Sequence, residues 1–116
     1  MQPFARYEKQ MLFKPLGLSG QKKLQKAQVG IVGVGALGTN MASLCARAGI
    51  GSLILVDDDR VELTNLQRQM LFDESDIGAL KAQRAAEKLA GINSEIKIEA
   101  FTERLTEANF SAIFSA

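Results

Sequence analysis

A glycine-rich run followed by an acidic segment is the part of this chain best suited to chemistry. Gly33, Gly35 and Gly38 follow a G-x-G-x-x-G spacing, and the next apolar stretch ends at Asp57. The first glycine of such a run allows a tight turn, the second lets the backbone approach a phosphate chain, and the third permits close packing of helix on strand. The free N–H groups of the following helix favour negative charge. The pattern therefore indicates a nucleotide site in which Asp57 accepts hydrogen bonds from ribose hydroxyls.

A polar segment follows Asp57 where a dehydrogenase would need only a short turn. It carries further carboxylates, among them Asp59, together with an amide and an arginine. Asn65 can offer amide donors, Arg68 can grip phosphate through its planar guanidinium, and Lys81 can add a point charge to the same phosphates. The alternative is a solvent-exposed loop whose charged residues are hydrated and bind no ligand.

Apolar periodicity and turn residues predict the elements that position these side chains. We expect strands at 29–34, 52–57 and about 95–101, and helices at 36–48, 78–90 and about 104–114, with an irregular segment at 58–77. The order βαβαβα predicts a three-layer, Rossmann-like α/β domain. Its parallel sheet has the strand order 3-2-1 and right-handed crossovers, which is the first half of a doubly wound fold.

The helix at 36–48 is expected to turn one apolar stripe toward the core and to stop at Gly49. The stripe contains Leu37, Met41, Leu44, Cys45 and Ala48, so Cys45 is interpreted as a core residue rather than a nucleophile.

Two domains follow from this reading of the elements. Residues 1–28 are interpreted as a helical lead-in, in which Ser19 caps a short helix ending at Lys26. Residues 29–116 are interpreted as the nucleotide-binding half domain, the first half of a doubly wound fold.

Composition limits the possible classes of protein. The chain has 116 residues, which suits one core, and a formal net charge of +1, which gives no electrostatic argument for nucleic acid or an anionic membrane. Neither a signal peptide nor a membrane span is expected, because charged residues interrupt the apolar ones near the start, so we expect a cytoplasmic protein. One cysteine and no histidine exclude an intrachain disulfide, a cysteine-cluster zinc site, and histidine triads or metal sites.

Five motifs together carry a resemblance to a known family. They are Arg6-Tyr7-Glu8-Lys9-Gln10, the glycine run, Asp57-Asp58-Asp59, Asn65-Leu66-Gln67-Arg68-Gln69 and Lys81. Over nearly its whole length the chain resembles the ThiF/MoeB/HesA adenylyltransferases, bacterial relatives of the ubiquitin-activating enzymes. The resemblance implies ATP-dependent, magnesium-assisted adenylation of the C-terminal glycine of a ubiquitin-like sulfur carrier protein, of the thiamine or molybdopterin type, usually in a homodimer.

The resemblance also implies roles for single residues. Asp57 matches the ribose-binding aspartate, while Asn65, Arg68 and Lys81 match residues that hold the ATP phosphates and steady the transition state. Lys9 stands where family members commonly carry an arginine that reaches the partner subunit's ATP site. A lysine keeps that charge but loses bidentate geometry.

The family's metal-binding aspartate is expected on a fourth strand, beyond the end of this sequence at Ala116. We therefore assign no metal ligand within the chain. We expect it to be the N-terminal, nucleotide-binding half of a larger enzyme and to be inactive alone.

The chemistry of adenylation agrees with these residue types. The substrate's own carboxylate attacks the α-phosphorus, so the protein need supply no nucleophile, and the absence of histidine is no objection. Catalysis is mostly alignment and neutralisation of charge, which suits Arg68 and Lys81. Two other classes stay open: an NAD(P)-binding oxidoreductase domain, and a catalytically silent nucleotide-binding or dimerisation module. The identity of the molecule that accepts the adenylyl group also stays open, and a role in transfer-RNA modification is one of the alternatives.

Overall fold

Three short apolar segments form a parallel sheet in the computed structural model, which describes residues 4–114. The strands are β1 (Gln28–Val32), β2 (Ser52–Val56) and β3 (Lys97–Phe101), in the order β1-β2-β3. The central strand β2 is covered on both faces, with four successive buried residues from Leu53 to Val56. A strand buried on both faces needs a continuous apolar run rather than an alternating one.

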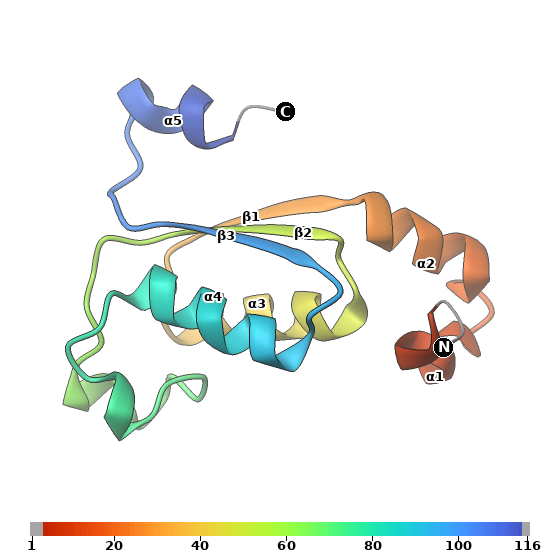
Figure 1. Cartoon of the computed structure of the whole chain (residues 1–116), viewed down its shortest axis with the longest axis horizontal. Helices are drawn as coiled ribbons and strands as arrows, with labels where there is room; N and C mark the ends of the chain where they lie inside the picture. Colours follow the sequence, from red (N-terminus) through yellow and green to blue (C-terminus); the bar gives the residue numbers. More distant parts are fainter. Residues whose placement is uncertain (1–3, 115–116) are drawn as a thin grey trace.

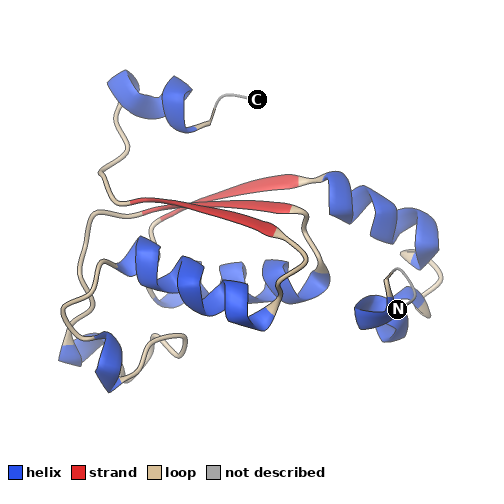
Figure 2. Cartoon of the chain, viewed as in Figure 1, coloured by secondary structure: helices blue, strands red, loops and turns tan. Residues whose placement is uncertain are grey.

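Helices cover the two faces of the sheet unequally (Figures 1 and 2). Helices α3 (Ala36–Ala48) and α4 (Lys81–Ile92) pack on one face, and the short α5 (Glu107–Ile113) lies on the other. The larger core lies between the sheet and α3 and α4, whereas Ile113 packs with Ile54 and Val56 on the opposite face. The α/β class, the parallel sheet, the three layers and the strand order are confirmed.

The amino-terminal helices lie beyond the amino ends of the strands, at the right in Figure 1. They are the 3-10 helix η1 (Ala5–Tyr7), α1 (Glu8–Met11) and α2 (Gly17–Lys26). Because α2 begins at Gly17 and Leu16 is its N-cap, the prediction that Ser19 caps this helix is wrong.

Neutral amides attach this amino-terminal segment to the end of α3. Gln10 Nε2 and Gln21 Nε2 both donate to the carbonyl oxygen of Ala48, at 2.7 and 3.0 Å. Asn93 Nδ2 donates to the carbonyl of Ala46 at 2.7 Å and to the Tyr7 hydroxyl at 2.9 Å. Carbonyl groups in the last turn of a helix have few partners within the helix, and these donors supply them.

The expected inward stripe of α3 is wrong for its large residues. Leu37, Met41 and Leu44 are 72%, 42% and 69% exposed. Ala42 and Ala46 face the core instead, and Cys45 is half-buried against it. The face of α3 that packs on the sheet therefore carries small side chains, and the large apolar ones lie on its outer face.

Several predicted boundaries shift for local reasons. Helix α4 begins at Lys81 rather than at Gly78, because Gly78 has a φ of +89° and Leu80 forms an antiparallel bridge with Arg60. It runs through Gly91 and ends at Ile92. Helix α5 begins only at Glu107, after the Thr106 side chain accepts a capping hydrogen bond.

The segment expected to be irregular holds two 3-10 helices, η2 (Leu63–Asn65) and η3 (Glu74–Asp76). Across residues 4–114, none of the helices combines the length and the apolar character needed to cross a bilayer.

Candidate nucleotide site

The glycine run forms the connection between β1 and α3 at the carboxyl edge of the sheet. Gly33 has a φ of +92°, a conformation that favours glycine, and its N–H donates to the Val56 carbonyl at 2.8 Å. Gly35 is the N-cap of α3. A Cβ on Gly38 would overlap the carbonyl oxygen of Gly33. The first N–H groups of α3 consequently stand at a tight turn that admits a close ligand.

Asp57 lies directly against this turn. Its Oδ2 accepts from the Val34 N–H at 2.6 Å, and its Oδ1 accepts from the Asp59 N–H at 2.7 Å. The carboxylate thereby joins the glycine turn to the acidic segment. Each carboxylate oxygen has a second lone pair, so the same side chain can still accept from ribose hydroxyls.

A cavity of about 230 Å³ opens beside Asp57 at the ends of all three strands. The residues that line it are Val32, Gly33, Val56, Asp57, Asp58, Asp59, Glu103, Arg104 and Leu105. Its four carboxylates suit hydroxyl groups such as those of ribose and disfavour a 2′-phosphate, so NADP fits it poorly.

Sequence reasoning missed Glu103 and Arg104 as lining residues of this cavity. They follow the third strand, and the carboxyl ends of parallel strands meet at one edge of a sheet. That topological rule could have found them.

The Asn65–Gln69 segment begins at the last residue of η2. Asn65 is buried and its Oδ1 accepts from the Glu62 N–H at 2.8 Å, so this oxygen helps to cap η2. Arg68 is exposed, and its Nη1 donates to the Thr64 carbonyl at 3.2 Å. Asn65 therefore has a structural task besides any contact with a ligand, whereas most of the Arg68 guanidinium is unengaged.

Gln69 brings this segment back to the glycine turn. It is only 3% exposed, and a Cβ on Gly35 would lie 3.8 Å from its Nε2. Its Oε1 is buried without a hydrogen-bond partner within residues 4–114. An unpartnered buried amide oxygen is costly, so this corner of the site is suited to receive a donor.

Lys81 joins the site through the backbone. Its N–H donates to the Asp59 carbonyl at 2.9 Å, which sets the first turn of α4 beside the acidic segment. The residue is 7% exposed, and its ammonium forms no ion pair with a carboxylate in the described part of the chain. A buried cation without an anion is suited to an anionic ligand.

Lys9 is the one predicted site residue that lies elsewhere. It is exposed on α1, which is attached to the far end of α3. Arg6 and Tyr7, its neighbours in the sequence motif, serve that attachment: Arg6 Nε pairs with Glu95 at 2.8 Å, and the Tyr7 hydroxyl accepts from Asn93. The contacts thus bring the glycine turn, Asp57, Asp59 and the Lys81 backbone together at the carboxyl edge of the sheet, and α1, which carries Lys9, lies at the amino ends of the strands. The side-chain hydrogen bonds of Asn65 and Arg68 stay within their own segment.

Three carboxylates, those of Asp57, Asp58 and Asp59, come within 4.8 Å of one another. Carboxylate oxygen is a suitable ligand for magnesium. Both oxygens of Asp57 already accept backbone N–H groups, however, and we assign no metal to this group.

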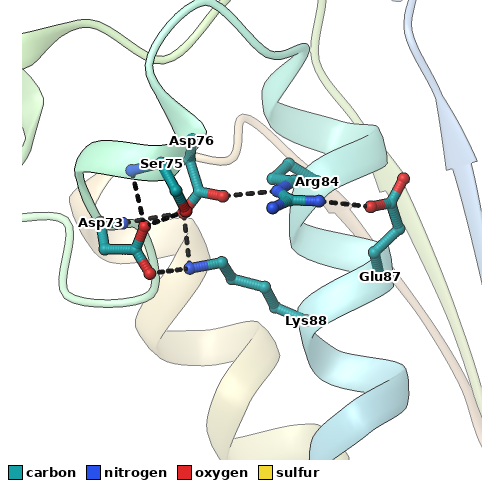
Figure 3. A network of polar contacts seen from close by, with 6 residues as sticks. All are labelled: Asp73, Ser75, Asp76, Arg84, Glu87 and Lys88. Atoms are coloured by element: carbon teal, nitrogen blue, oxygen red, sulfur yellow. Dashed lines mark hydrogen bonds and ion pairs between the residues drawn. The ribbon is translucent and has the colours of Figure 1, made fainter.

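An ion cluster around the buried Asp76 connects the turn before α4 to Arg84 and Lys88 on that helix (Figure 3). Asp76 has no exposed surface and accepts from Arg84 Nε and Lys88 Nζ, each at 2.5 Å. Burial alone raises the pKa of the Asp76 carboxyl, but hydrogen bonds from Lys88 and Arg84 outweigh it and hold the pKa below its usual value. Hydrogen bonds from Ser75 and Lys88 lower the pKa of Asp73 to about 2.

A glycine turn at the carboxyl edge of a parallel sheet, with an aspartate after the second strand, defines a Rossmann-type nucleotide-binding fold. The pattern of the ThiF family matches residues 7–116, and this chain belongs to that family. The resemblance expected from the motifs is confirmed.

Named relatives agree with this assignment. The chain is 47% identical over 103 residues to the sulfur carrier protein ThiS adenylyltransferase of Escherichia coli K12, a match that covers 89% of this chain and 41% of the relative. The crystal structure of E. coli MccB with ATP aligns at a TM-score of 0.84 and 34% identity, over 93% of this chain and 34% of that one.

A second solved structure is similar in fold at lower identity. The E. coli tRNA N6-threonylcarbamoyladenosine dehydratase TcdA, in complex with ATP, aligns at a TM-score of 0.89 and 28% identity, over 97% of this chain and 46% of that one. The chain thus spans less than half the length of each of these three relatives.

Proposed function

We propose that this chain binds ATP and takes part in the adenylation of the C-terminal carboxylate of a ubiquitin-like sulfur carrier protein. The observation that carries the proposal is that Asp57 accepts from the Val34 N–H in the glycine turn, while the Lys81 backbone is bonded to Asp59 in the same acidic segment. Similar chains in the ThiF family supply the class of reaction, and solved relatives were crystallised with ATP.

Each residue of the site has a proposed role. Asp57 accepts from the ribose hydroxyls, and Asp59 shapes the same cavity. Gly33 forms the tight turn, the backbone N–H groups at Gly35 and Gly38 face the phosphates, and Asn65 donates to them. Arg68 and Lys81 neutralise the charge that grows as pyrophosphate leaves.

The proposed step needs no nucleophile from the protein. A carrier carboxylate oxygen bonds to the α-phosphorus while the bond to pyrophosphate breaks, so the products are an acyl-adenylate and pyrophosphate. Magnesium bound with ATP would neutralise phosphate charge. The absence of histidine and the packing of Cys45 against the core are compatible with this chemistry.

The assembly is also proposed. We place residues 1–28 as a lead-in to the nucleotide-binding half of a longer cytoplasmic enzyme that works as a homodimer, with Lys9 reaching the site of the second copy. The position of α1 at the opposite edge from the glycine turn supports a contact of this kind. A thiamine-type carrier fits the name of the ThiS adenylyltransferase relative, and a molybdopterin-type carrier is the second candidate.

A second acceptor class has one observation in its favour. The likeness to a tRNA dehydratase crystallised with ATP suggests a carboxylate on a modified tRNA nucleoside as acceptor. The formal net charge of +1 supports the carrier protein instead, because RNA binding usually needs a basic surface.

Nucleotide preference tests the proposal directly. Calorimetry of this chain with ATP, NAD and NADP should show ATP bound at least about tenfold more tightly than either dinucleotide. A preference for NAD would favour an oxidoreductase domain, and binding of none of the three would favour a silent module.

A further inference from the structure

Asp76 is a buried carboxylate that takes no part in the proposed chemistry. Besides Arg84 and Lys88, it accepts from the Asp73 N–H at 2.8 Å, so both of its oxygens are engaged (Figure 3). Burying a charge is expensive unless it is paired and hydrogen-bonded. The two cations meet that need, and they come from a single helix, α4.

The two cations share a helix face with Lys81. Lys81, Arg84 and Lys88 are spaced i, i+3 and i+7, so they follow one line along α4. An anion fixed against Arg84 and Lys88 therefore fixes the rotation of α4 about its axis. That rotation decides the direction in which Lys81 leaves the first turn.

The start of α4 is also fastened to the acidic segment. The Val61 N–H donates to the Ala79 carbonyl and the Gly78 N–H donates to the Val61 carbonyl, both at 2.8 Å. The Lys81 N–H donates to the Asp59 carbonyl. Asp76 belongs to the same turn, because its backbone carbonyl accepts from the Ala79 N–H at 2.9 Å.

From these contacts we propose that Asp76 is a positioning residue, which holds Lys81 in the nucleotide site through Arg84 and Lys88. The inference rests on the proposed function, because it takes Lys81 as a phosphate contact. Asp76 itself touches no ligand.

Hydrogen exchange tests the positioning without any nucleotide. Asp76→Asn should speed exchange of the Lys81 amide by about tenfold or more, since it loosens the turn that holds this N–H against Asp59. The matched control is Glu87→Gln, which removes only the exposed Arg84–Glu87 pair and should leave the Lys81 amide unchanged. Unchanged protection in Asp76→Asn would overturn the proposal.

A double-mutant cycle on ATP binding tests the link to Lys81. Asp76→Asn should weaken ATP binding by about tenfold but leave adenosine, which has no phosphates, within about twofold. In the Lys81→Ala background the same change should have no further effect on ATP. Equal loss for ATP and adenosine, or full additivity with Lys81→Ala, would show that Asp76 supports the fold only.

A milder variant covers the case in which Asp76→Asn fails to fold. Lys88→Gln leaves the Arg84–Asp76 pair in place and should give the same ATP-selective loss of affinity to a smaller extent. An ATP affinity equal to that of the wild type would contradict the proposal. If the wild type itself does not prefer ATP, the proposed function fails, whereas the exchange result still decides whether Asp76 orders the start of α4.

Discussion

Asp57 has a structural role as well as its proposed binding role. Its two oxygens accept the N–H groups of Val34 and Asp59, so the carboxylate shapes the glycine turn before any ligand arrives. The sequence pattern predicted the ribose contact but could not show these backbone contacts. A ligand would therefore meet an aspartate whose orientation is already set, which lowers the entropic cost of binding.

Removing this carboxylate should weaken ATP binding. Asp57→Ala is expected to cost about 1.5–3 kcal/mol of binding free energy, through loss of charge-assisted hydrogen bonds to ribose. Calorimetry measures the change, and Glu87→Ala serves as the control, because Glu87 is an exposed carboxylate of α4 that pairs with Arg84 and does not line the cavity beside Asp57. An unchanged ATP affinity in Asp57→Ala would remove Asp57 from the site.

Arg68 should act on the transition state more than on the bound substrate. In the longer enzyme proposed above, Arg68→Ala should lower the kcat of ATP–pyrophosphate exchange more than it raises the KM for ATP, because the guanidinium meets charge that grows as pyrophosphate departs. Arg47→Ala is the control, since Arg47 is exposed on α3 and donates to Ser43. A pure rise in KM with normal kcat would contradict this role.

At the scale of elements, α4 is held by charge as well as by apolar packing. Its inner face buries Ala82, Ala85 and Leu89, while Arg84 and Lys88 form ion pairs with Asp76 in the preceding turn. This arrangement ties a helix that begins in the site to the turn that precedes it. The stability of that turn should therefore depend on the ionisation of the carboxylates.

Acid should loosen this cluster selectively. The folded pKa values of Asp73 and Asp76 are both below the usual 3.8, so the stability they contribute is present above about pH 4 and is lost as the pH falls toward 2. Urea unfolding at pH 5 and pH 2.5 should show a smaller pH dependence in Asp73→Asn than in the wild type. An equal dependence in both proteins would show that Asp73 titrates normally.

The elements themselves were largely predictable, and their inner faces were not. Apolar runs and turn glycines indicated the first two strands and α3, and alternation of apolar and polar residues indicated the third strand. Gly49, with a φ of +92°, ends α3 as expected. A period of 3.6 residues cannot tell which of two stripes faces inward, so Leu37 and Leu44 were placed in the core. The ion cluster around Asp76 depends on tertiary contacts that sequence spacing does not show.

At the scale of the whole molecule, the two ends of the sheet carry different parts of the proposed function. The carboxyl edge gathers the nucleotide site, and the amino edge holds α1 with Lys9. A residue at the amino edge can serve this kind of site only in another copy of the chain.

Complementation between copies tests that arrangement. In the complete enzyme, Lys9→Ala mixed with Lys81→Ala should recover part of the activity that each variant lacks, because one of the two sites in a mixed dimer keeps both lysines. Pyrophosphate exchange after subunit mixing measures the recovery. Activities that simply average would argue against a contact across the interface, and Lys14→Ala provides a control lysine from the same region.

An exposed sheet edge should govern the behaviour of the 116-residue chain in solution. Within residues 4–114, β1 pairs only with β2, and the segment Val29 to Gly33 is apolar and uncharged. We expect self-association through this edge and no pyrophosphate exchange by the chain alone. Sedimentation velocity should show oligomers that Val32→Lys reduces, since Val32 is 58% exposed. A stable monomer would contradict the edge argument.

The amides that bind the amino-terminal segment to α3 carry no formal charge. Gln10, Gln21 and Asn93 donate to the helix carbonyls as neutral groups, unlike the exposed Arg6–Glu95 pair nearby. Dissolved salt weakens exposed ion pairs but has little effect on buried amide hydrogen bonds. The segment that carries Lys9 should therefore stay docked at ionic strengths that break the Arg6–Glu95 ion pair. Its position against α3 is set independently of the surrounding electrolyte.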